Sequence, residues 1–325
     1  MSANHAAFNL IFRFVENYIS PIAGRISSQR HVMAIRDGFI SAMPFMIVGS
    51  FLLVFAYPPF SPDTTWGFAR AWLDLAKEFE GRILTPFDMT MGIMSIYICA
   101  AISYNLGKHY EKSNQLDPFM CAMLSIMAFL LIAAPKTNGT LPVDSLGGTG
   151  IFTAILVAIY CVEMMRFLKA HNIGIRLPDQ VPPMIKNSFD LLIPVLVVVL
   201  TLYPLSLFIQ HHFDMLIPQA IMAIFKPLVS AADSLPAILL AVLIGHLLWF
   251  AGIHGAAIVS GMLQMFWLTN LGMNQQALAQ GAPLPHIFME RSGPSLSWSE
   301  VPVPPWGWCS AICAVVQRIC APLVV

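Results

Sequence analysis

Charged residues are scarce in this chain of 325 residues, at 10% of the total, while hydrophobic residues make up 57%. Soluble domains average about 25% charged residues and about 45–50% apolar ones. Seventeen basic and seventeen acidic residues cancel, so no charge excess favours a polyanionic partner. The composition excludes a cytosolic globular enzyme, a disordered chain and a nucleic-acid binder. It predicts an all-α polytopic membrane protein.

The chain also lacks the motifs that hold cofactors or catalyse reactions. It contains no GxGxxG, Walker, GxSxG or HExxH sequence and no CxxC pair. Of its six cysteines, those at 99, 121 and 161 lie in apolar stretches and are expected to be small buried side chains. Those at 309, 313 and 320 have no histidines at zinc spacing. We therefore expect no metal, no cofactor and no catalytic residue.

The N-terminal segment does not have the pattern of a cleavable signal peptide, because Arg13 and Glu16 interrupt its apolar run. Apolar residues instead recur there at helical spacing: Phe8, Ile11, Phe12, Val15, Ile19 and Ile22. This spacing predicts that residues 1–37 include an amphipathic helix lying on the membrane or on the helical bundle.

Five apolar runs have about the length of a membrane span. They cover residues 38–57, 89–107, 118–135, 151–168 and 191–209. Pro194 and Pro204 are expected to bend the fifth, which membrane helices tolerate. Between the first two runs, residues 61–85 have the pattern of a second interfacial amphipathic helix.

The pattern changes after the fifth run. Residues 215–229 are too few for a span and include Lys226, and residues 236–271 are apolar but interrupted by glycines. No Asp, Glu, Lys or Arg occurs in the 56 residues from 234 to 289. Such a stretch is typical of broken helices and re-entrant hairpins, whose freed backbone must be covered by protein or line a wet cavity.

The distribution of Lys and Arg predicts that the N-terminus is cytoplasmic. In that orientation ten such residues lie inside and four outside. The inner residues are Arg13, Arg25, Arg30, Arg36, Lys108, Lys112, Arg166, Lys169, Arg176 and Lys186, and the outer ones are Arg70, Lys77, Arg82 and Lys136.

The candidate binding motif within the charge-free stretch contains Trp249, Gly252, His254 and Gly255. The glycines allow the backbone to leave helical geometry and approach a ligand closely. An imidazole at membrane depth can both donate and accept hydrogen bonds, and an aromatic ring can cover a sugar. The alternative is a packing pair of glycines beside a histidine bonded to a carbonyl, and the sequence leaves both open.

The other polar residues near the spans have simpler interpretations. His246 is expected to be structural, and His211 with His212 to lie at a solvated interface. Glu163 can snorkel or pair with Arg166 three residues later, and Asp190 can cap a helix or lie at the interface.

Three stretches together resemble enzyme IIC, the membrane component of bacterial sugar phosphotransferase systems, and in particular its lactose/cellobiose/diacetylchitobiose permeases. They are HVMAIRDGFISAMP at 31–44, LPDQVP at 177–182 followed by Ser188 and Phe189, and LWFAGIHG at 248–255. The resemblance covers roughly residues 10–290, and the order and spacing of the three motifs also fit.

The resemblance implies an inner-membrane permease for a β-linked disaccharide such as cellobiose or diacetylchitobiose. It implies a homodimer, with residues 38–210 as the dimerisation-side bundle and 211–290 as part of the sugar-carrying domain. His254 would contact the sugar. The phosphoryl group would come from a cysteine of a partner IIB protein, itself supplied by a IIA protein, and phosphorylation would trap the sugar inside.

Residues 291–325 depart from the family pattern, which continues with a Gly-Gly-Ser-Gly-Ala motif. They hold three tryptophans, three cysteines and five prolines, and prolines forbid a continuous helix. Residues 298–308 can be encoded so that a frame shifted by two nucleotides reads Val-Gly-Gly-Ser-Gly-Ala-Thr-Leu-Gly-Leu. We therefore expect a frameshift, a permease truncated within its carrier domain, and no coupled uptake.

Two other interpretations remain at this point. One is an integral-membrane enzyme that uses His254 on a lipid-linked substrate, although the charge-free stretch offers it no acid or nucleophile. The other is a chain that folds its first five spans and assembles only with an intact copy.

Overall fold

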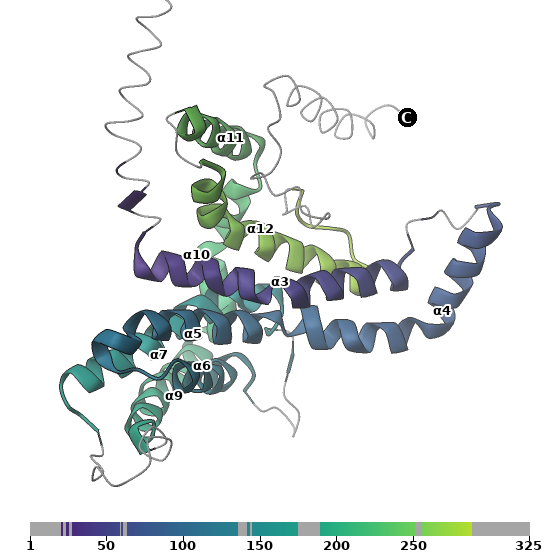
Figure 1. Ribbon diagram of the computed structural model, residues 1–325. Helices are drawn as coiled ribbons and strands as arrows, with labels where there is room; N and C mark the ends of the chain where they lie inside the picture. Colours follow the sequence, from purple (N-terminus) through teal and green to yellow (C-terminus); the bar gives the residue numbers. More distant parts are fainter. Residues whose placement is uncertain are drawn as a thin grey trace, which may run out of the picture. The chain divides into compact units, whose positions relative to one another are not determined.

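The computed structural model describes residues 21, 24–25, 28–58, 60, 64–135, 142–143, 145–174, 189–250 and 255–287. Every regular element in these ranges is helical (Figure 1). The elements are α3 (Arg30–Ala56), α4 (Gly67–Phe87), the π-helical η2 (Asp88–Gly92), α5 (Met94–Asn114), α6 (Pro118–Ala133), the 3₁₀ turn η3 (Gly148–Gly150), α7 (Ile151–Ala170), α9 (Leu192–Phe213), α10 (Ile217–Ala232), α11 (Leu235–Phe250) and α12 (Gly255–Ala279). The predicted helix near the N-terminus falls outside the described residues.

Helix α5 forms the centre of the bundle and packs against α3, α6 and α7. Its residues Ile98, Ile102 and Leu106 are fully buried. Small residues bring the neighbouring helices close: a Cβ added at Gly38 of α3 would lie 2.9 Å from the backbone nitrogen of Ile102. Such close backbone approach at small residues is typical of helix packing in membranes.

Among the described residues, four helical stretches are long and apolar enough to cross a membrane: Arg30–Ala56, Gly67–Asn114, Gly148–Ala170 and Leu192–Phe213. They contain four of the five predicted spans. The remaining one is α6, whose 16 residues make it about 24 Å long. Asp117 caps α6 by accepting from the backbone N–H groups of Phe119 (2.9 Å) and Met120 (3.3 Å). Pro204 lies inside the continuous helix α9, so this proline does not end the span.

The predicted amphipathic segment at 61–85 is helix α4, and it does not end where the sequence suggested. Through η2 it leads almost directly into α5, with only Ile93 between them. At its start an aromatic cluster forms, in which the ring centroids of Trp66 and Phe68 are 5.5 Å apart and those of Phe55 and Trp72 are 5.7 Å apart. Trp66 and Phe68 are exposed, as expected for aromatic side chains at a membrane interface.

The region after α9 is broken as the glycine pattern predicted. Helices α10 and α11 meet at a bend of 69°. Helix α11 ends at Phe250 and α12 begins at Gly255, so the apolar stretch is interrupted within the candidate motif. These three helices therefore form a bent pair followed by a hairpin.

Candidate functional site

The candidate motif lies where α11 and α12 meet. Trp249 belongs to the last turn of α11, and Gly255 is the first residue of α12. Gly252 and His254 lie outside the described residues, and of Trp249 and Gly255 the structure describes the backbone. The motif thus occupies the junction of two helices, while the contact of His254 with a ligand stays a prediction.

Helices α11 and α12 pack against each other to form the hairpin. A Cβ added at Gly245 would lie 3.9 Å from Cγ2 of Val259. Gly245 of α11 and Val259 of α12 therefore face each other across the two arms of the hairpin, and residues 251–254 between the arms lie outside the described residues. An added Cβ at Gly245 would make an ordinary van der Waals contact, so this glycine faces α12 and has room for a larger side chain.

A hydrogen-bonded cluster fixes the base of the hairpin. Asp233, at the bend before α11, accepts from Nδ1 of His286 (3.1 Å) and from the backbone N–H of Ile287 (3.1 Å). The Asn274 amide donates to the His286 carbonyl (2.7 Å) and accepts from the His286 N–H (3.0 Å). The side chains of Asp233 and His286 are only 13% and 11% exposed. This cluster ties the start of α11 to the segment after α12.

Helix α12 is also tied to α3 of the bundle by polar contacts. The Gln275 amide donates to Oγ of Ser50 at 2.7 Å. Near the end of α3, the Tyr57 hydroxyl lies 2.8 Å from Oε1 of Glu80 and 3.1 Å from the carbonyl oxygen of Ala279. These bonds position the base of the hairpin against the bundle.

Glycine contacts bring α12 against η3. A Cβ added at Gly148 would lie 2.9 Å from the backbone nitrogen of Met273 and 3.0 Å from the carbonyl carbon of Gly272. Beside this contact, the rings of Phe152 on α7 and Phe225 on α10 stack with centroids 4.5 Å apart. Backbone meets backbone at Gly148, so no side chain can be accommodated there without a shift of a whole helix.

A second polar cluster surrounds Glu163 on α7. Arg166 pairs with its carboxylate at 2.6 Å, which confirms the predicted ion pair. Nε2 of His31 lies 2.9 Å from the same carboxylate, and the Tyr110 hydroxyl donates to it at 2.8 Å. His31 is the first residue of the motif at 31–44, so this cluster joins the beginning of α3 to α5 and α7. The sequence suggested the Arg166 contact only, because the other partners are 132 and 53 residues away.

The other polar residues that the sequence singled out are characterised by the contacts they make. Nδ1 of His246 lies 2.7 Å from the Val242 carbonyl oxygen of its own helix, and Asp190 pairs with Lys169 at 3.3 Å. His211 is exposed at the end of α9. The thiols of Cys99, Cys121 and Cys161 are buried and free. Where the structure describes the chain, no three His, Cys, Asp or Glu side chains come together as a metal site; the cysteines at 309, 313 and 320 lie outside that part.

The described helices form a bundle of the kind found in polytopic membrane proteins, and comparisons identify the family. Residues 36–298 match the family model of the phosphotransferase system EIIC domain. The chain therefore belongs to the EIIC family of phosphotransferase-system permeases. Membership of this family favours the permease interpretation over the interpretation as a membrane enzyme acting through His254.

Individual relatives support this assignment. The chain is 32% identical to the cellobiose-specific EIIC component of Geobacillus stearothermophilus and 30% identical to the lichenan permease IIC component of Bacillus subtilis, over 86% and 87% of its own length. It spans 64% of the length of each of these relatives. The crystal structure of ChbC, the IIC component of the N,N'-diacetylchitobiose-specific phosphotransferase system, is similar with a TM-score of 0.73 and 32% identity. That match covers 86% of this chain and 66% of ChbC.

Proposed function

We propose that this chain translocates a β-linked disaccharide, such as cellobiose or diacetylchitobiose, for phosphorylation by a partner IIB protein that is itself supplied by a IIA protein. The observation that carries the proposal is the family match, which covers helices α11 and α12 and the stretch of sequence that holds the candidate motif. Relatives named for cellobiose, lichenan, oligo-β-mannosides and diacetylchitobiose support the choice of β-linked sugars.

The charge distribution of the hairpin suits this role. A neutral disaccharide needs hydrogen-bond partners and a covering aromatic ring, which His254 and Trp249 would supply. No Lys or Arg occurs between 234 and 289 to pair with a phosphate group. Because burying an unpaired anion is costly, a phosphorylated sugar would be excluded from the same site. Phosphorylation on the cytoplasmic side would therefore trap the sugar in the cell.

The proposed substrate can be tested by direct binding. Calorimetry of the purified protein with cellobiose, diacetylchitobiose and lactose is expected to show saturable binding of at least one of them. The α-linked disaccharide maltose and cellobiose 6-phosphate are expected to bind much more weakly. Equal affinity for maltose and the β-linked sugars would contradict the proposed specificity. Failure of all β-linked sugars to bind in a folded protein, with a frame-restored version tested in parallel, would contradict the function itself.

Our proposal includes a reading-frame shift after about residue 298. The family match ends at residue 298, and residues 298–308 can be encoded so that a frame shifted by two nucleotides would read the glycine-rich family motif. Coupled uptake would then depend on restoring the frame, as an incomplete site leaves sugar hydroxyls without partners. The coding DNA decides this point: a sequence that cannot encode the family motif in either shifted frame would rule the shift out.

The proposed organisation follows the sequence boundaries. Residues 38–210 would form the dimerisation-side bundle of a homodimer, 211–290 would belong to the sugar-carrying domain, and the N-terminus would be cytoplasmic. The ten-to-four distribution of Lys and Arg supports this orientation.

Orientation can be tested with Thr65, an exposed residue before α4. In Thr65→Cys, a membrane-impermeant maleimide is expected to label intact cells, because this segment would face the periplasm. In Ser113→Cys, at the exposed end of α5, labelling is expected only after the cells are opened. The unsubstituted chain gives the background from its own cysteines. The reverse pattern, with Ser113→Cys labelled in intact cells, would invert the proposed topology.

A further inference from the structure

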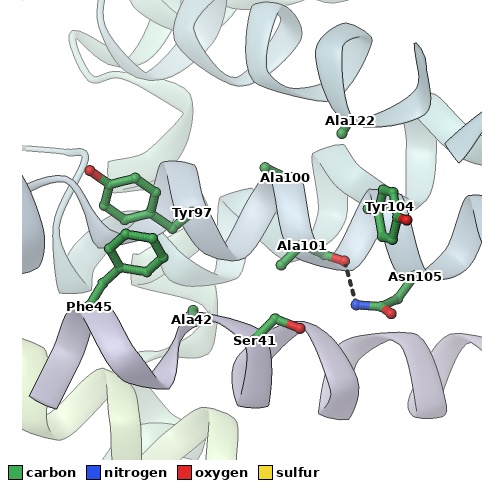
Figure 2. A pocket seen from close by; sticks show the side chains of 9 residues that line it. All are labelled: Ser41, Ala42, Phe45, Tyr97, Ala100, Ala101, Tyr104, Asn105 and Ala122. Carbon is green, nitrogen blue, oxygen red and sulfur yellow. Dashed lines mark hydrogen bonds between the residues drawn. The ribbon is translucent and has the colours of Figure 1, made fainter. Parts of the chain in front are cut away.

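We propose that a groove on the side of the bundle binds one acyl chain of an anionic phospholipid, with the phosphate held by Lys108 and Lys112. The groove lies between α3, α5 and α6 and has a volume of about 380 Å³. Its floor consists of small side chains, Ala42 from α3, Ala100 and Ala101 from α5 and Ala122 from α6 (Figure 2). It opens on the surface of helices long and apolar enough to span the bilayer, which is where lipid chains pack.

One end of the groove is closed by an aromatic pair. The rings of Phe45 on α3 and Tyr97 on α5 stack with centroids 4.3 Å apart and planes within 7° (Figure 2). The Tyr97 hydroxyl donates to the Met89 carbonyl oxygen at 2.7 Å and so holds the ring in place. A flexible chain entering along the alanine floor would therefore end against a flat, fixed apolar wall.

Toward the other end the same face of α5 becomes polar and then basic. Tyr104 and Asn105 line the groove, and the Asn105 amide donates to the Ala101 carbonyl oxygen at 2.8 Å. Lys108 and Lys112 follow at intervals of three to four residues, which places them on the same helix face. Both lysines are exposed, and neither has an ion-pair partner among the described residues.

The acidic groups near this end leave the lysines available. Asp37 of α3 is paired with Arg36 at 2.8 Å, so its charge is already compensated. Glu111 is exposed and, at 3.6 residues per turn, lies about 60° around α5 from Lys108 and about 100° from Lys112; no ion pair joins it to either lysine among the described residues. The basic end is therefore suited to an anionic head group, which polybasic sites attract by about 1 kcal/mol per lysine.

The length of the groove distinguishes a lipid chain from other occupants. Eleven residues separate Tyr97 from Lys108, which corresponds to about 16 Å along a helix. Half of a hydrocarbon core of about 30 Å is about 15 Å. When the lysines lie at the level of the lipid head groups, the aromatic pair therefore lies near the middle of the bilayer. This depth matches the length of one acyl chain of a phospholipid.

The test is photocrosslinking of the full chain in vesicles of phosphatidylcholine with phosphatidylglycerol. A phosphatidylglycerol probe with a diazirine near its chain end is expected to label the groove residues of α3 and α5. Ala101→Leu, which fills the groove, is expected to abolish this labelling. Ala223→Leu, at an exposed position of α10, enlarges a side chain outside the groove and is expected to leave it unchanged.

The lysines are tested separately, because they are exposed and their replacement should leave the fold intact. Lys108→Gln with Lys112→Gln is expected to weaken labelling by the phosphatidylglycerol probe about thirtyfold, while labelling by a phosphatidylcholine probe changes little. The control pair is Lys77→Gln with Lys226→Gln, at exposed positions of α4 and α10. Unchanged groove labelling in Ala101→Leu would overturn the proposal. Formation of a disulfide bond between two copies of the Ser41→Cys variant would also overturn the proposal, because a second copy would then occupy the groove.

Discussion

Replacing His254 with alanine is expected to weaken sugar binding by about 1–3 kcal/mol, which is roughly a 5- to 150-fold increase in Kd. The reason is that a sugar hydroxyl buried in the proposed site would lose a partner that can both donate and accept a hydrogen bond. The measurement is calorimetric titration of the frame-restored chain with the β-linked sugar that binds best.

The matched control is His211→Ala. His211 is exposed at the end of α9 and outside the hairpin, so its removal is expected to leave the affinity unchanged. A His254→Ala protein that binds as tightly as the parent would remove the one side chain assigned to hydrogen-bond the sugar. It would favour the other interpretation, in which the histidine bonds to a neighbouring carbonyl and the glycines only assist packing.

Replacing Gly148 with alanine is expected to destabilise the protein by about 1–3 kcal/mol, the usual effect of overpacking a tight contact. The added Cβ would lie 2.9 Å from the backbone nitrogen of Met273. Because that atom belongs to the backbone of α12, the clash is relieved only if the helix moves away from η3. Equilibrium unfolding of the purified protein in mixed micelles measures the change in free energy.

Gly81→Ala is the corresponding control. Gly81 lies inside α4 with nothing within 4 Å of an added Cβ. Alanine is favoured over glycine in a helix by about 1 kcal/mol, so this variant should be neutral or slightly more stable. Equal stability of the two variants would show that η3 and α12 do not pack as closely as described.

Local pattern was enough to predict most of the helices. The predicted spans at 38–57 and 151–168 coincide, to within one residue, with parts of the spanning helices Arg30–Ala56 and Gly148–Ala170. The glycines of the 236–271 stretch predicted a broken segment, and the structure breaks there, after Phe250. The sequence misjudged the end of α4, because nothing local indicates that Asp88–Gly92 continues as a π-helix into α5.

Contacts between distant residues could not be predicted in the same way. Asp233 and His286 are 53 residues apart, and Ser50 and Gln275 are 225 apart. One signal was available: Asp233 is the last carboxylate before the charge-free stretch. A lone charge at the edge of such a stretch is expected to find a partner, because an unpaired buried charge is costly. The predicted role of His254 lies outside the described residues and is tested by the binding experiment.

The bond between Ser50 and Gln275 also has a consequence for biogenesis. At about 5–20 residues per second, the ribosome needs about 10–45 s to add the 225 residues between them. Helices α3, α5, α6 and α7 are synthesised well before α12 and can associate through their own buried contacts. During this interval Ser50 and the backbone near Gly148 face the lipid or the insertion machinery without their later neighbour. Membrane integration of this protein should therefore proceed through a long-lived partial bundle, which α12 completes by entering a gap already formed between its predecessors.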